Sequence, residues 1–307
     1  MNVLLLILLN VIVPVFLLIG AGVLMHRVFQ LDMNTLSKLN AFFLLPAVSF
    51  TNIYESNIDA GMLLNILGFL VLQSVTLIVL SKLTAKLARF DKGLSSSFSN
   101  SVVLSNSGNF GLPVSQLVFQ NNPVGLSVGV VVTIYHNLLT NTFGLINAVS
   151  AQSHGQKLFK ELAKNPMIYA FLLGLLMHTL AIPIPAFVWN PLQHVASAFL
   201  AIALVTLGAQ SAHLQFKRIS AALVCSLLGR LVISPAIALA LIFILKLEGT
   251  TAQALLIASA FPTSRNSAVF ALEYGNHPEY AAQVVLLSTL LSSVTVAMVV
   301  YAAKLLF

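Results

Sequence analysis

Long apolar stretches recur along this chain of 307 residues, and they constrain its fold more than any other feature. About ten of them approach the roughly 20 residues that a helix needs to cross a bilayer. Charged residues make up only 7% of the chain, against about 25% in a soluble domain, so they cannot cover a water-facing surface. Lipid-exposed backbone must satisfy its own hydrogen bonds, and the stretches are too long and too uniformly apolar for barrel strands. We therefore expect an all-α polytopic membrane protein with spans at 3–25, 35–53, 61–81, 95–119, 124–149, 167–182, 190–211, 219–245, 251–272 and 281–303.

The basic residues predict how the chain is threaded through the membrane. Eleven of the fifteen lysines and arginines fall in the loops after spans one, three, five and seven: Arg27, Lys38, Lys82, Lys86, Arg89, Lys92, Lys157, Lys160, Lys164, Lys217 and Arg218. The positive-inside rule makes this side cytoplasmic, with both termini on the outer face of the membrane. The net charge of +7 thus follows membrane loops rather than a phosphate-binding face, and nucleic acid is not an expected partner.

A hydrophilic segment at 150–166 divides the chain into two sets of five spans. We expect a first five-helix repeat at 1–150, a cytoplasmic linker at 151–166 and a second five-helix repeat at 167–307. Because each set holds an odd number of spans, the second enters the membrane from the opposite side. Such inverted repeats are the architecture of many secondary transporters.

The fourth span of each half is interrupted by residues that disfavour a helix. Ser105 to Pro113 contains asparagines, serines, glycines and a proline, and Pro262 stands in a similar polar run in the ninth span. Helical hydrogen bonding should fail there, and the freed backbone groups must face protein or a cavity. Packing explains one such span well, but two at matching positions favour discontinuous helices around a midplane substrate site. The substrate-binding candidates in these spans are Asn106, Ser107, Asn109, Pro113, Ser259, Pro262 and Asn266.

Two arginines lie inside predicted spans. A charge near the bilayer centre is costly and normally faces a cavity or a partner, and the planar guanidinium matches a carboxylate. Arg265, beside Pro262, is therefore a candidate for binding an anion. The alternative is an internal ion pair with Glu273, which is also the only acidic candidate for ion coupling near the site. For Arg230 we expect a structural role, either snorkelling to the cytoplasmic face or holding the broken helix by its carbonyls.

The fifth span carries polar and small residues along one helical face: Thr133, His136, Asn137, Thr140, Asn141 and Gly144. In lipid such a face must turn inward, where it lines a cavity or bonds to other helices. Asn137 and Asn141 are accordingly binding candidates. His136 is either a coupling group for protons or a satisfied interior histidine. Ser49, in the second span, either approaches the site from the opposing domain or packs.

Motifs for ATP binding and for zinc proteolysis are absent from the sequence. It has no phosphate-binding loop and no HExxH, and its one cysteine, Cys225, forms no metal site. We expect no enzyme, no cofactor and no metal. The remaining reading is a secondary carrier for a small organic anion, either a uniporter or coupled to protons or sodium. The alternative is a membrane-embedded sensor that binds the anion without translocating it.

Three segments carry a resemblance to a known family: NAFFLLPAVSF in span two, SNSGNFGLPVS in span four and SAFPTSRNSAVFALEYG in span nine. On these the chain resembles the auxin efflux carrier family, in its bacterial branch of malonate or malate permeases. This branch implies that the membrane is a bacterial inner (plasma) membrane. The resemblance implies ten helices in a 5+5 inverted repeat, similar to the bile-acid/sodium symporter-like fold, with spans four and nine crossing. It implies a scaffold (spans one, two, six and seven), a transport domain that moves like an elevator, and a possible homodimer.

The resemblance also implies where a substrate carboxylate would be held. The asparagine–proline pairs of the family's crossing map onto Asn109 and Pro113, and onto Pro262 and Asn266. Arg265 departs from the pattern, because related sequences often have a small or neutral residue there. If Arg265 faces the site, it favours a more strongly anionic substrate.

Overall fold

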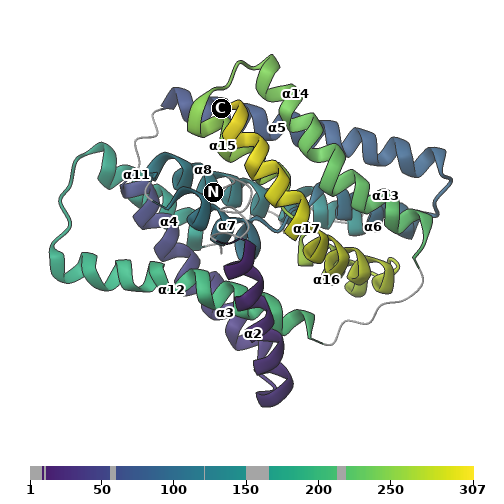
Figure 1. The fold of residues 1–307 in the computed structure, drawn as a ribbon, viewed down its shortest axis with the longest axis horizontal. Coiled ribbons are helices and arrows are strands. Elements are labelled where there is room, and N and C mark those ends of the chain that lie inside the picture. Colours follow the sequence, from purple (N-terminus) through teal and green to yellow (C-terminus); the bar gives the residue numbers. More distant parts are fainter. Residues whose placement is uncertain (1–8, 10–11, 56–59, 121, 150–165, 213–218) are drawn as a thin grey trace.

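The computed structural model describes residues 9, 12–55, 60–120, 122–149, 166–212 and 219–307, and the described chain is mainly helical (Figure 1). The α-helices are α2 (Val13–Phe29), α3 (Met33–Leu39), α4 (Leu45–Tyr54), α5 (Ala60–Leu87), α6 (Lys92–Val103), α7 (Leu112–Phe119), α8 (Pro123–Leu139), α9 (Leu145–Val149), α11 (Pro166–Thr179), α12 (Ala186–Ser211), α13 (Ala221–Leu228), α14 (Ser234–Ile244), α15 (Gly249–Ser259), α16 (Arg265–Glu273) and α17 (Pro278–Leu306). Four π-helical turns join neighbours among them: η2 (Asn40–Leu44), η3 (Ser107–Gly111), η4 (Thr140–Gly144) and η5 (Gly229–Ile233).

Five helical runs in the described residues are long and apolar enough to cross a membrane: Gly61–Leu87, Pro123–Ala148, Ala186–Gln210, Ala221–Ile244 and Pro278–Leu306. Two shorter apolar helices, α2 and α11, accompany them. Large apolar side chains such as Leu17, Leu64 and Met298 are exposed on the outside of the bundle. An outer surface of this kind suits lipid, and it agrees with the prediction of an all-helical, multi-pass membrane protein.

Two of the expected spans are interrupted, as the sequence predicts. The first interruption lies at 104–106, between α6 and η3, and the second lies at 260–264, between α15 and α16. The prediction that Pro113 breaks the helix is wrong, however. This proline lies in the first turn of α7, beyond the interruption. Proline is tolerated there because the first amides of a helix have no partner within it.

Three of the π-helical turns end two residues before a proline. These turns are η2, η3 and η5, and the prolines are Pro46, Pro113 and Pro235. In each case the residue between turn and proline donates its amide five positions back, as Leu112 does to the carbonyl of Ser107. A proline ring clashes with the carbonyl four residues earlier in an α-helix, and a wider turn at that point gives it room.

The helices pack into two groups (Figure 1). In one, α12 packs along α2 and α4, and α11 packs along α4. In the other, α5 packs on α6 and α14, while α15 packs on α8, α14 and α17. Contacts of α8 with α4, and of η3 and α7 with α12, join the groups. The first interruption therefore lies at the junction between them.

Glycine allows the closest helix contacts in the first group. A Cβ atom at Gly22 of α2 would lie 2.1 Å from the carbonyl oxygen of Val205 in α12, and one at Gly208 would lie 1.9 Å from that of Ile19. Small residues commonly allow helix backbones to approach in membranes. The pair α11 and α4 shows the same feature, since a Cβ at Gly174 would lie 2.9 Å from the carbonyl oxygen of Phe50.

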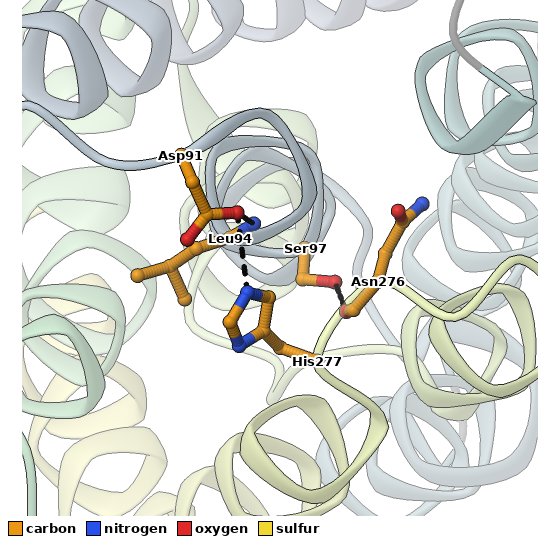
Figure 2. Close-up of polar contacts among 5 residues, drawn as sticks. All are labelled: Asp91, Leu94, Ser97, Asn276 and His277. Carbon is orange, nitrogen blue, oxygen red and sulfur yellow. Dashed lines mark hydrogen bonds and ion pairs between the residues drawn. The ribbon is translucent and has the colours of Figure 1, made fainter.

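A polar contact ties the start of α6 to the turn between α16 and α17 (Figure 2). The Asp91 carboxylate accepts the Leu94 amide at 3.0 Å, and it lies 3.2 Å from Nε2 of His277. Beside it, the Ser97 hydroxyl donates to the carbonyl of Asn276. The turn after the third expected span and the turn after the ninth thus lie together. Spans that alternate in direction place two turns that each follow an odd-numbered span on the same side of the membrane, as this contact needs.

We expect Asp91→Ala to lower the melting temperature of the detergent-solubilised protein modestly at pH 7, because α6 loses its N-cap. Asp91→Asn, which can still cap, is the matched control and should stay close to the parent. The Leu94 amide, then His277, lower the pKa of Asp91 below its ordinary value of 3.8. The carboxylate therefore stabilises the fold above that pH and ceases to as the pH falls through the lowered pKa. A melting temperature of Asp91→Ala equal to that of the parent at pH 7 would contradict the capping role.

Candidate functional site

The two interruptions meet and bond to each other through their backbones. The amide of Asn106 donates to the carbonyl of Pro262 at 2.8 Å, and the amide of Ser264 donates to the carbonyl of Leu104 at 2.8 Å. Ser105 and Thr263 thereby form an isolated antiparallel bridge. Each interruption supplies part of the hydrogen bonding that the other lost on leaving the helix, so both can be buried.

The second interruption follows from the chemistry of Pro262. Proline has no amide hydrogen to continue α15, and the next amide, that of Thr263, donates to the Ser288 hydroxyl of α17 at 3.1 Å. The Thr263 hydroxyl donates to the carbonyl of Ser101 in α6 at 2.8 Å. The break is therefore satisfied by groups that belong to other helices.

Arg230, in η5, binds the carbonyls at the ends of both broken helices. Its Nε donates to Phe261 at 2.8 Å and its Nη2 to Ser259 at 3.0 Å. Its Nη1 donates to Val102 at 3.2 Å and more weakly to Val103 at 3.5 Å. The side chain is 2% exposed, so it does not snorkel to a membrane face. The C-terminal ends of α6 and α15 carry partial negative charge, and this buried cation offsets it. Of the two structural roles expected for Arg230, holding the broken helix by its carbonyls is confirmed.

A cavity of about 370 Å³ lies beside the two interruptions. Residues from both helix groups line it: Ser37, Asn40, Ala41, Phe42, Leu45, Ser105, Asn106, Ser107, Gly108, Asn109, Asn137, Thr140, Asn141, Pro166, Met167, Ser264, Arg265 and Asn266. Three of the four π-helical turns named above, η2, η3 and η4, contribute to this lining. Its volume falls within the range of small-molecule sites, at the lower end.

The electrostatics of this cavity favour an anion. The half-helices that begin after the interruptions, η3 with α7 and then α16, both start with residues that line it. Helix N-termini carry partial positive charge and unpaired amides. Arg265 adds a full charge, and in the described part of the chain its half-buried guanidinium makes no hydrogen bond or ion pair. No acidic side chain is among the described residues that line the cavity.

The polar face of the fifth span turns toward the first interruption. Nδ1 of His136 lies 3.0 Å from the Ser105 hydroxyl, and the Thr133 hydroxyl lies 3.3 Å from the carbonyl of Ser107. His136 is buried, and its hydrogen bond to Ser105 links α8 to the first interruption. Farther along the same face, Asn137 and Asn141 line the cavity.

The structure separates the residues that the sequence singled out into two sets. The set that lines the cavity is Asn106, Ser107, Asn109, Asn137, Asn141, Arg265 and Asn266. The set outside that lining is Ser49, Pro113, His136, Ser259 and Pro262. Ser49 bonds to the carbonyl of Met167 at 3.3 Å, and the carbonyl of Ser259 accepts from Arg230. The side chain of Glu273 lies outside the described residues, so its proposed pair with Arg265 is untested.

Several lining residues were not singled out from the sequence as site residues. Asn40 has a detectable signal, an amide side chain in a largely apolar span, and it belongs to a segment on which the family resemblance rests. Met167 and Phe42 have no such signal, because apolar side chains in a membrane span are unremarkable in sequence. Their place in the lining depends on how α4 and α11 pack beside the interruptions.

Comparison with known proteins identifies the family of this chain. The family model described as "Membrane transport protein" matches residues 7–157 and 150–300. A protein of Methanothermobacter thermautotrophicus (strain Delta H), described as an uncharacterized transporter, is 24% identical over 270 residues, which cover 86% of this chain and 87% of the relative. The chain belongs to the membrane transport protein family, the family of the auxin efflux carriers.

Proposed function

We propose that this protein is a secondary transporter of a small organic anion, a mono- or dicarboxylate such as malonate or malate, which it moves by elevator-like alternating access. The observation that carries the proposal is electrostatic. Two half-helix N-termini and the guanidinium of Arg265, which has no partner among the described residues, converge on one cavity. Arg230 occupies the opposite, negative ends of the broken helices. A carboxylate in the cavity would complete this arrangement of charges.

The arrangement of glycines supports the inverted repeat of ten spans. The first expected span of the first half places Gly22 against Val205, in the second expected span of the other half. The first expected span of the second half places Gly174 against Phe50, in the second expected span of the first half. This reciprocal packing, and an interruption in the fourth expected span of each half, are what two halves of related structure and opposite direction would give.

The position of the cavity along the spans suggests which side it opens to. Ser37 and Asn40 flank Lys38 at the start of the second expected span, on the side of the basic residues. Met167 begins the sixth, directly after the basic segment, and Asn141 lies in the half of the fifth span that leads into it. With the basic side in the cytoplasm, the cavity corresponds to an inward-facing state. Alternating access would carry Arg265 and both interruptions past α2, α4, α11 and α12.

We expect Arg265→Ala to reduce carboxylate transport at least about tenfold, because the site loses its only full charge among the described lining residues, an interaction worth about 1.5–3 kcal/mol as a charged hydrogen bond. The measurement is charge movement on solid-supported membranes, followed by labelled uptake into proteoliposomes, with a panel of mono- and dicarboxylates. Asn109→Ala should weaken transport in the same way. Arg89→Ala, which removes an exposed arginine outside the cavity, is the matched control and should transport like the parent.

Two results would contradict the proposal. Transport by Arg265→Ala at the parental rate would remove the anion site from this cavity. Saturable carboxylate binding with neither charge movement nor labelled uptake would point instead to a membrane-embedded sensor, which binds the anion without moving it.

A further inference from the structure

Two side chains in the cavity wall each have one buried amide atom with no partner among the described residues. In the part of the chain described, Nδ2 of Asn106 and Oδ1 of Asn40 make no hydrogen bond, and these are the only such buried side-chain atoms among the lining residues. Asn40 is 2% exposed and Asn106 is 7% exposed. A buried polar group left unpaired costs about 1–3 kcal/mol. A ligand in this cavity is well placed to supply the missing partners.

The neighbours of Asn40 fix which of its atoms needs a partner. The hydroxyl of Thr206 donates to the carbonyl of Ile202 at 2.6 Å, so toward Asn40 it can only accept. The atom of Asn40 that lies 3.0 Å from this hydroxyl is therefore the amide nitrogen. The carbonyl oxygen is left over, and what it lacks is a hydrogen-bond donor. Asn106 is in the opposite situation, because its unpaired group is an NH₂ that lacks an acceptor.

A ligand that satisfies both groups must carry an acceptor and a donor. A carboxylate is the acceptor that Asn106 and Arg265 require together. The donor for Asn40 is not an ammonium group, since it would share the cavity with the guanidinium of Arg265, and two positive charges in one cavity repel each other. No described lining residue is acidic to offset that repulsion. An uncharged hydroxyl meets the same requirement without the penalty.

We propose that the cavity selects a hydroxycarboxylate, whose carboxylate binds Arg265 and Asn106 and whose hydroxyl donates to Oδ1 of Asn40. The inference rests on the transport function proposed above and adds the residue that discriminates among carboxylates. Asn40 belongs to the helix group of α2, α4, α11 and α12, whereas Asn106 belongs to the first interruption and Arg265 to the start of α16. The hydroxyl contact thus bridges the two groups, and it is made only when the site lies beside η2.

The test compares two substrates that differ by one hydroxyl, malate and succinate, in proteoliposomes. The parent protein should prefer malate by about tenfold to a hundredfold in competition against labelled malate, as expected for one buried hydrogen bond of about 1.4–3 kcal/mol. Asn40→Leu should lose this preference and still transport succinate. Asn34→Leu, an exposed asparagine of the same segment outside the cavity, is the matched control and should keep it.

A second variant guards against misfolding of Asn40→Leu. Thr206→Val leaves Asn40 in place but removes the acceptor that orients its amide, so the preference for malate should fall while uptake persists. Equal transport of malate and succinate by the parent would overturn the hydroxyl contact and leave the carboxylate carrier standing. An unchanged preference in Asn40→Leu or Thr206→Val would overturn the role of Asn40. Transport of neither substrate nor of any carboxylate in the panel would overturn the proposed function itself.

Discussion

Arg230→Met is expected to yield little or no folded protein, with a melting temperature at least about 10 °C below that of the parent. Methionine keeps much of the length of the side chain but donates nothing. The carbonyls of Phe261, Ser259 and Val102 would then remain buried without their shared donor. Removing one partner from a buried charged interaction typically costs about 3–5 kcal/mol, and both broken helices meet at this side chain.

Arg230→Lys separates the charge from the geometry of this contact. An ammonium group still offsets the negative ends of α6 and α15, but it cannot reproduce the fork that reaches both at once. Its melting temperature should fall between those of the parent and Arg230→Met, measured by size-exclusion chromatography and thermal scans in detergent. Arg27→Met, on an exposed arginine with one long contact of 3.4 Å to a carbonyl, should change little. A stable, monodisperse Arg230→Met would show that the interruptions hold together without the guanidinium.

Gly22→Ala is expected to destabilise the protein by about 1–3 kcal/mol, because the added methyl group would lie 2.1 Å from the carbonyl oxygen of Val205. That is an overlap with backbone, which no side-chain rotation relieves, so α2 and α12 must move apart. Gly20→Ala is a close control in the same helix, since a Cβ there meets nothing within 4 Å. It should be neutral or slightly stabilising, as alanine favours a helix over glycine by about 0.5–1 kcal/mol.

The double variant Gly22→Ala with Gly208→Ala adds a sharper measurement. Both glycines serve the same helix contact, so once the helices have separated for one methyl group, the second should cost less than it does alone. Melting temperatures of the four proteins give this coupling directly. If Gly22→Ala and Gly20→Ala melted at the same temperature, the close approach of α2 and α12 would not contribute to stability.

Five of the expected spans match long apolar helical runs in the described residues, because the lipid imposes a simple rule on them. The expected span 124–149 corresponds to α8, η4 and α9, and 281–303 lies within α17. The second interruption is equally predictable, since Pro262 states locally that the helix cannot continue. The first is predicted only as lying somewhere in Ser105 to Pro113. Its place at 104–106 is not predictable, because no proline lies there and the bonds that hold this segment come from Arg230 and Ser264, far away in the chain.

The lining of the cavity, too, could be predicted only in part. Polar residues of the interruptions and of the fifth span could be selected from the sequence, because a buried amide in an apolar span requires an explanation. Ser49 is likewise a buried polar residue in an apolar span, and yet its hydroxyl donates to the carbonyl of Met167. Whether a polar side chain faces the cavity or a neighbouring backbone depends on packing between the helix groups, which no single span encodes.

The wide turns before Pro46, Pro113 and Pro235 have a consequence for which mutations the protein can accept. Each amounts to one surplus residue in a helix, and one residue corresponds to a rotation of about 100°. Deleting one residue within such a turn would rotate every later side chain of that helix away from its neighbours, even though all the other residues are unchanged. At these three places the number of residues matters more than their identity, so the gene should tolerate substitutions there better than it tolerates deletions.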